Sequence, residues 1–166
     1  MTPEELTDLI KKLESAGYQV LAVVSDLDGA NRSVPTQLGA TLECPRFPNP
    51  ARPGHYIYYL FDPVHVIKLI RTHLVRTGFK INGYLIGGQE IFDEFMKKLE
   101  ESKKNSDIRI APKLTPRHVE FKNQDCQNVR LACELLSTTT ANTMELLYPG
   151  NENFKKLSNL IRLFDN

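Results

Sequence analysis

The sequence predicts an α/β fold followed by an all-α part. Two short apolar runs, residues 18–24 and 55–61, have the length and the β-branched or aromatic composition of strands, and a helical pattern follows each of them. Beyond Gly78, helical patterns dominate and no convincing strand separates them. These observations place a boundary between an α/β part over residues 1–80 and a helical part over residues 81–166.

The first predicted helix has recognisable ends. Thr2 can cap its N-terminus, Pro3 suits the first helical position, and Glu5 completes a capping box with Thr2. Gly17 can end the helix in a left-handed conformation. The apolar positions at helical spacing between these ends are Leu6, Leu9, Ile10 and Leu13. The pattern therefore predicts an amphipathic helix before the first strand.

The other elements of the α/β part follow in chain order. The run over residues 18–24 predicts a buried strand, and a short helix over about residues 30–38 comes after it. Residues 43–54 contain four prolines and cannot continue a helix or a central strand, so we expect a loop there. After the second strand, Asp62 and Pro63 start a helix in the preferred way. Strand, helix and strand at this spacing indicate a parallel or mixed sheet with a right-handed crossover.

Three helical patterns make up the second part. They cover residues 89–101, about residues 125–147, and residues 153–164. No internal repeat or low-complexity tract interrupts them.

The composition is that of a folded protein. Hydrophobic residues make up 41% and charged residues 25% of the 166 residues, which excludes a disordered chain. The formal net charge of +1 gives no global attraction to nucleic acid or membrane, so any such binding depends on local clusters. An acidic N-terminus and the lack of an 18-residue apolar run argue against export and against a membrane span. Cys44, Cys126 and Cys133 form no CxxC motif, which favours a reducing compartment over a disulfide framework or a thiolate zinc site.

Two carboxylates follow the predicted strands directly. Asp26 comes after the first strand and Asp62 after the second, where open α/β sheets place ligands and metal ions. If the strands are neighbours, both carboxylates lie at one edge and could share a divalent cation. The alternative is that each aspartate caps the helix that follows it. On position alone this explanation is favoured for Asp26, and it is stronger still for Asp62. For His65 in the next turn we favour a half-buried, hydrogen-bonded role over metal binding.

One segment has a one-sided charge. No acidic residue occurs between Asp62 and Glu90, and the cations within that stretch are Lys68, Arg71, Arg76 and Lys80. Such a helix can contact the phosphates of DNA or of a nucleotide, although an ordinary solvated face has the same composition. Neither GxxxxGK[ST] nor GxGxxG is present, and the pair Gly87-Gly88 stands alone. A nucleotide site would therefore be built without a standard phosphate loop.

Four segments together resemble the P-element transposase family. They are residues 17–31 (GYQVLAVVSDLDGAN), 59–71 (YLFDPVHVIKLIR), 127–141 (QNVRLACELLSTTTA) and 163–166 (LFDN). They occur in the order of the family and span nearly the whole chain. This combination is far more specific than any one of the four segments.

The resemblance implies a partial RNase H-like catalytic domain, over residues 1–80, that leads into a helical insertion domain that binds GTP. The family's enzymes are cut-and-paste DNA transposases, in which three carboxylates hold two divalent metal ions such as Mg²⁺. By resemblance, Asp26 is the second of these catalytic, metal-binding carboxylates. The first would precede Met1 and the third would follow Asn166, so we expect a fragment or truncated relative that does not cleave DNA by itself.

The resemblance also implies transposon-end DNA as a partner and the nucleus as the location. The alternative is a domesticated, non-catalytic module that binds DNA, a nucleotide or a partner protein.

The resemblance implies four cofactor-binding residues for GTP. They are Lys113, Asn128, Val129 and Asp165, of which Asp165 would read the guanine base. Asn128 stands where the family has a lysine, and Ile161 stands where an asparagine assists base recognition. We therefore expect weakened GTP binding, unless Arg130 supplies the missing charge.

Overall fold

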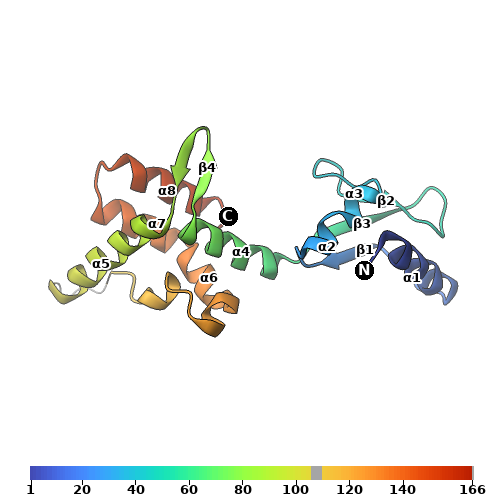
Figure 1. The fold of residues 1–166 in the computed structure, drawn as a ribbon, viewed down its shortest axis with the longest axis horizontal. Coiled ribbons are helices and arrows are strands. Elements are labelled where there is room, and N and C mark those ends of the chain that lie inside the picture. The colour runs from blue at the N-terminus through green and yellow to red at the C-terminus, as the bar shows by residue number, and fades with distance from the viewer. Residues whose placement is uncertain (106–109, 166) are drawn as a thin grey trace. The chain divides into compact units, whose positions relative to one another are not determined.

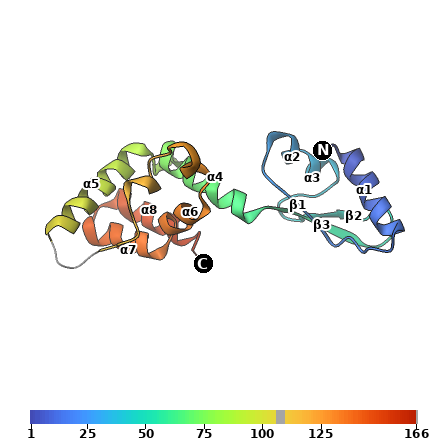
Figure 2. The ribbon, with the colours of Figure 1, turned by 90° about the horizontal axis from the view of Figure 1, so that it is seen from below.

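A computed structural model describes residues 1–105 and 110–165 of the chain. The chain divides into two compact units, Met1–Val66 and Ile67–Asn166, which can be followed by colour in Figures 1 and 2. The division falls within the helix α4 (Pro63–Arg76). The sequence-based boundary after residue 80 divides a predicted catalytic domain from a predicted GTP-binding domain. The compact units do not test that division, so it stays a prediction. No helix in the described ranges is long and apolar enough to cross a membrane.

The first unit contains a three-stranded mixed sheet. Its elements in chain order are α1 (Pro3–Ser15), β1 (Ala22–Ser25), α2 (Gly29–Arg32), α3 (Val34–Gln37), β2 (Arg46–Pro48) and β3 (Tyr56–Phe61). The strand order is β1-β3-β2, with β1 parallel to β3 and β2 antiparallel to it. The predicted mixed α/β character is confirmed.

Three details of the first unit differ from the prediction. The proline-rich segment is not only a loop, because its residues 46–48 form β2 at an edge of the sheet, where a proline is tolerated. The predicted helix over residues 30–38 is split into α2 and α3, and Pro35 lies in the first turn of α3. The first strand begins only at Ala22, and one of its faces is exposed.

The helix α1 covers one face of this sheet, and both views show it beside the strands. Its predicted capping box is confirmed, since the Thr2 N–H donates to Glu5 Oε2 at 2.8 Å and the Glu5 N–H donates to Thr2 Oγ1 at 3.2 Å. The buried residues between helix and sheet include Leu6, Ile10, Val34, Phe47, Ile57 and Tyr59. This apolar contact stabilises the unit.

The opposite face of the sheet is bare. Side chains alternate along β3, so that Ile57 and Tyr59 are buried while Tyr56, Tyr58 and Leu60 are exposed. On β1, Val24 is 61% exposed and adds to this apolar surface. A sheet face in contact with water normally carries polar side chains. The composition of this face is instead that of a sheet face packed against another part of a protein.

The second unit is mainly helical. Its elements after α4 are β4 (Phe79–Ile81), β5 (Tyr84–Ile86), α5 (Gln89–Asn105), the 3₁₀ turns η1 (Pro116–His118) and η2 (Asn123–Gln127), α6 (Val129–Leu135), α7 (Thr138–Leu147) and α8 (Glu152–Arg162). The core between these elements includes Leu74, Phe92, Phe95, Leu135, Met144, Phe154 and Ile161. The predicted helices over residues 89–101 and 153–164 correspond to α5 and α8.

Two predictions for this unit were wrong. The antiparallel strands β4 and β5 form a hairpin that the sequence reading missed, although its turn residues Asn82 and Gly83 are a strong turn signal, with φ of 50° and 82°. The single helix over about residues 125–147 is interrupted twice. Asn128 and Ser137 each cap a new helix with a side-chain oxygen, which accepts from the N–H of Leu131 at 3.2 Å and of Thr140 at 3.3 Å.

The hairpin packs closely on the end of α4. Gly87 has a φ of 91°, and a Cβ atom at this position would lie 2.4 Å from the carbonyl oxygen of Leu74. Gly78, with a φ of 70°, would bring its Cβ within 2.8 Å of the carbonyl oxygen of Ile86. Both positions therefore require glycine, for the backbone conformation and for the close approach of the two segments.

Candidate carboxylate edge and nucleotide pocket

The structure brings the two strand-end carboxylates to one edge of the sheet. Because β1 and β3 are parallel neighbours, Ser25 pairs with Phe61, and the residues that follow them leave the sheet together. The Asp62 N–H donates to the carbonyl oxygen of Ser25 at 2.8 Å. Asp26 and Asp62 thus follow adjacent strand ends, as their positions in the sequence predict.

The two carboxylates have different local roles. Asp62 Oδ1 accepts from the Val64 N–H at 2.9 Å, so Asp62 caps the start of α4. The helix after Asp26 is capped by Asp28 instead, whose Oδ1 accepts from the Gly29 N–H at 2.8 Å. Asp26 therefore does not cap this helix, and its carboxylate bonds within the turn instead.

Asp26 is held in its ionised form. Its Oδ1 accepts from Asn31 Nδ2 at 2.7 Å and from the Asp28 N–H at 3.2 Å. These bonds, that of Asn31 first, hold the pKa of Asp26 below its usual value, and the nearby His65 adds a smaller effect. His65 itself is partly buried, as expected.

The described residues hold no cluster of candidate metal ligands. In residues 1–105 and 110–165, no group of three or more His, Cys, Asp or Glu side chains is arranged to hold a metal ion. Asp26 is ionised and well positioned, but a divalent cation requires several oxygen ligands from the protein or water. Two-metal chemistry needs carboxylates beyond those that the described part of the chain brings together.

A pocket of about 310 Å³ lies at the N-terminal end of α7. Its lining includes Lys113, Glu134, Ser137, Thr139 and Thr140, together with apolar side chains such as Leu114. One ammonium group, one carboxylate and three hydroxyl-bearing residues therefore line a hollow at a helix N-terminus, and the hydroxyls of Ser137 and Thr140 donate to the carbonyl oxygen of Glu134. Of the four residues expected to bind GTP, Lys113 lines this pocket.

Asp165 lies at the same end of α7. Its Oδ2 accepts from the Thr138 N–H at 2.6 Å, and Thr138 directly precedes two residues that line the pocket. Hydrogen bonds from the Thr138 hydroxyl and N–H lower the pKa of Asp165, so this carboxylate stays charged at neutral pH. Lys113 and Asp165, which are far apart in the sequence, thus each lie near the start of α7, Lys113 in the pocket lining and Asp165 at the Thr138 N–H.

Asn128 and Val129 lie at the opposite end of α6 from this pocket. Asn128 caps α6, and a helix of seven residues is about 10 Å long. The Nε of Arg130 donates to Oε1 of Glu134, which lines the pocket, at 2.9 Å, so the charge of Arg130 is matched by a carboxylate. The buried His118 contacts the second oxygen of Glu134 through Nε2 at 3.1 Å.

Ile161 is turned away from solvent. Its side chain is 0% exposed and belongs to the core between the helices. A residue in this position cannot contact a base without a rearrangement of the core. The expected role of this position in base recognition is therefore not visible in the described structure.

Sequence reasoning did not single out the hydroxyl groups that line the pocket. Ser137, Thr139 and Thr140 belong to the run Ser-Thr-Thr-Thr, which was noticed only as part of a resemblance. The signal that could have found them is the run itself, because consecutive hydroxyl side chains favour a helix N-terminus over a helix interior.

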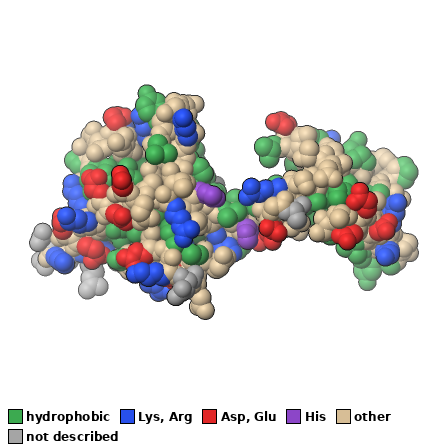
Figure 3. All heavy atoms as spheres, in the orientation of Figure 1, with side chains coloured by type: hydrophobic (Ala, Val, Ile, Leu, Met, Phe, Trp, Pro, Cys, Tyr) green, Lys and Arg blue, Asp and Glu red, His purple; other side chains and the backbone are tan. Residues whose placement is uncertain are grey.

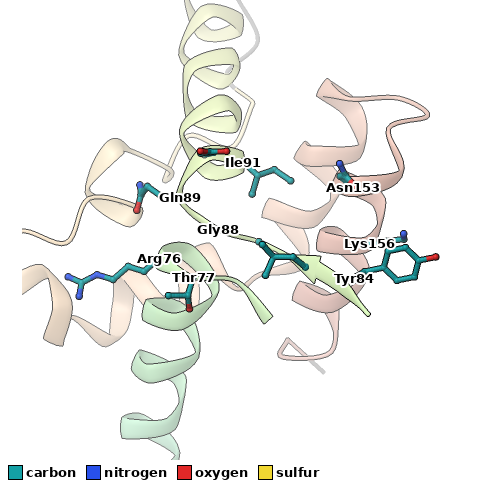
Figure 4. A pocket seen from close by; sticks show the side chains of 11 residues that line it. Arg76, Thr77, Tyr84, Gly88, Gln89, Ile91, Asn153 and Lys156 are labelled. Carbon is teal, nitrogen blue, oxygen red and sulfur yellow. The ribbon is translucent and has the colours of Figure 1, made fainter. Parts of the chain in front are cut away.

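A second cavity, of about 500 Å³, lies between the hairpin and the helices α5 and α8 (Figure 4). Its two cations have other contacts: Lys156 Nζ lies 3.5 Å above the ring of Tyr84, and the guanidinium of Arg76 lies 4.8 Å from the ring of Phe121. Figure 4 shows Arg76 extended away from Tyr84 and Lys156. No residue expected to bind GTP lines this cavity, so we prefer the smaller pocket as the nucleotide site.

Comparison with known proteins gives a consistent result. The sequence model of a family described as "TNP-like, GTP-binding insertion domain" matches residues 64–166. The Transposable element P transposase of Drosophila melanogaster is 32% identical over 148 residues, which are 89% of this chain and 19% of the relative. The solved structure of the Drosophila P element transposase strand transfer complex matches 99% of this chain and 37% of its own chain, with 32% identity and a TM-score of 0.82. This chain therefore spans about a fifth of the length of the curated relative.

The burial of Ile161 predicts the effect of an asparagine at this position. We expect Ile161→Asn to lower the free energy of unfolding by about 3 kcal/mol, because it removes buried apolar surface and buries an amide. Leu163→Asn is the matched control, since Leu163 is 70% exposed and its replacement changes stability by less than about 0.5 kcal/mol. Urea unfolding of both variants measures the difference. Equal stability of the two would contradict the placement of Ile161 in the core.

Proposed function

Because the chain belongs to the P-element transposase family, we propose that its second unit binds GTP at the N-terminal end of α7. The observation that carries this proposal is that Lys113 and Asp165 both lie near the start of α7, in a segment matched by the family model of a GTP-binding insertion domain. An ammonium group binds phosphate oxygens, and a carboxylate accepts from the N1–H and N2–H groups of guanine. The two groups suit opposite ends of one nucleotide.

The size of the pocket indicates how the nucleotide lies. About 310 Å³ is at the small end of ligand pockets, which span roughly 300–1,000 Å³. The pocket thus accommodates part of a nucleotide. We place the base beside Asp165, the first phosphates beside Lys113 and the hydroxyl groups, and the remaining phosphates along α6 toward Val129 and Asn128. In this arrangement the side-chain amide of Asn128 lies at the end of the triphosphate. The family has a lysine at this position of the sequence.

The substitution at position 128 lowers the expected affinity. Loss of one charge-assisted contact to a phosphate removes on the order of 1.5–3 kcal/mol, or about tenfold to a hundredfold in affinity. Arg130 does not replace that charge while it pairs with Glu134. We therefore propose weak binding that depends on Lys113 and Asp165.

For the first unit we propose a place in an RNase H-like catalytic domain of a longer transposase that acts on transposon-end DNA in the nucleus. Asp26, ionised at the end of β1, is the proposed catalytic and metal-binding carboxylate. The bare apolar face of the sheet supports this proposal, because Tyr56, Tyr58 and Leu60 are exposed as they would not be in a complete domain. The free edge of β1 can accept another strand beside Asp26. The alternative of a non-catalytic domesticated module has less support.

Calorimetric titration with GTP, GDP and ATP tests the nucleotide proposal. We expect GTP to bind more tightly than ATP, Lys113→Ala and Asp165→Asn each to weaken GTP binding by about tenfold or more, and Asn128→Lys to strengthen it by a similar factor. Lys97→Ala, at an exposed position of α5, is the control and leaves the affinity unchanged. Because Asp165 also holds the start of α7, circular dichroism must show that Asp165→Asn is folded. Equal binding of GTP and ATP, or no effect of Lys113→Ala, would place the nucleotide elsewhere.

The carboxylate edge predicts the outcome of a nuclease assay. We expect the 166-residue protein not to nick supercoiled DNA in Mg²⁺ or Mn²⁺, since Asp26 lacks companion carboxylates in the described part of the chain. Gel electrophoresis of the plasmid is the measurement, with Asp26→Ala as the comparison. Metal-dependent nicking that disappears in Asp26→Ala would show that this chain holds a complete site.

A further inference from the structure

A group of cations in the second unit lies around residues 117–127, and two of them contact the ring of Phe121. We call Lys68, Arg71 and Arg76 of α4, together with Arg117 of η1, the Phe121 cluster. The guanidinium groups of Arg71 and Arg76 lie 4.9 Å and 4.8 Å from the centroid of the Phe121 ring. Figure 3 shows Lys and Arg side chains on the surface over α4.

The remaining two members are fixed by the segment that follows Phe121. Lys68 Nζ donates to Gln127 Oε1 at 3.0 Å. Arg117 Nη2 donates to Asp125 Oδ1 at 2.6 Å. Four cations from two separate segments are therefore held in one place by specific contacts, which an ordinary solvated helix face does not require.

The charges in this cluster are not balanced. In residues 1–105 and 110–165, no ion pair joins Lys68, Arg71 or Arg76 to a carboxylate, and Asp125 pairs with Arg117 alone. The sequence has no acidic residue between Asp62 and Glu90, so α4 supplies none either. The cluster thus has more positive than negative charge.

Arg71 is the most unusual member. Its side chain is 0% exposed, and burial lowers its pKa. Its Nη2 donates to the carbonyl oxygen of Asp125, but Nε and Nη1 are buried without a hydrogen-bond partner. The carboxylate of Asp125 offsets part of the cost of burying Arg71, but two buried nitrogens without a hydrogen-bond partner remain unfavourable. Stability alone therefore does not account for an arginine here.

We propose that the Phe121 cluster binds the phosphodiester backbone of DNA. The exposed Arg76 and the half-buried Lys68 contact phosphates, and Arg117 contacts them through Nη1, which its ion pair with Asp125 does not use. The buried Arg71 adds positive potential beneath them. Lys68 and Arg76 are eight residues apart on one helix, a rise of about 12 Å, which suits a row of phosphates better than a single anion. The proposal rests on the proposed function in naming DNA. The site is separate from the nucleotide pocket, since no member of the cluster lines that pocket.

Fluorescence anisotropy with a short labelled DNA duplex, measured over a series of salt concentrations, tests the proposal. We expect Lys68→Ala, Arg76→Ala and Arg117→Ala each to weaken binding about fivefold or more, and to reduce the slope of log K against log[salt] by about 0.9, because each removes one phosphate contact. Lys97→Ala on α5 is the control and retains the affinity and the slope. Arg76→Lys and Arg117→Lys keep the positive charge, so we expect them to have a slope close to that of the unchanged protein. This result would show that the alanine variants act through lost charge and not through misfolding.

Three results would overturn the proposal. The first is an effect of Lys97→Ala as large as that of the cluster variants, which would mean diffuse attraction. The second is displacement of the duplex by saturating GTP, which would make the cluster part of the nucleotide site. The third is no binding of the duplex at low salt. Calorimetric titration of the same variants with GTP is an independent measurement. If GTP does not bind, the nucleotide proposal is contradicted, but the result of the DNA titration is unaffected.

Discussion

The break between α6 and α7 at Ser137 is the feature on which the proposed nucleotide site depends. In one continuous helix the N–H groups of Thr138 and its neighbours would bond to carbonyl groups of the preceding turn. Instead, Ser137 caps a new helix and Asp165 accepts from the Thr138 N–H at 2.6 Å. The break also opens the hollow that Lys113 lines. The pocket and the position of Asp165 are thus consequences of one interruption of the helix.

A different constraint governs the first unit. The parallel pairing of β1 and β3 brings Asp26 to an edge of the sheet, and the hydrogen bonds from Asn31 and Asp28 keep it ionised. The same sheet leaves an apolar face in water, which is unfavourable by about 25 cal/mol for each Å² of apolar surface. An ionised carboxylate without companions in the described residues and an apolar surface without a cover both fit the proposal that this unit is part of a larger domain.

The sequence predicts best where a signal is local. The capping box of Thr2 and Glu5, and the cap of Asp62 before Pro63, are short-range chemistry and were predicted correctly. The hairpin at Asn82 was missed because strands of three residues have no visible periodicity. The pocket could not be predicted, since it combines a loop near Lys113 with the start of α7 and depends on packing between distant segments. The burial of Ile161 is likewise a result of helix packing.

The most direct test of the proposed site is an NMR titration of the ¹⁵N-labelled protein with GTP. The account predicts that the largest amide shift changes fall on Thr138, Thr139 and Thr140 and on Lys113, because these groups surround the proposed ligand. The cavity of about 500 Å³ lies elsewhere in the same unit, so GTP bound there would shift a different set of amides. Shift changes centred on Thr77, Gly88 and Asn153, with none at the start of α7, would contradict the account.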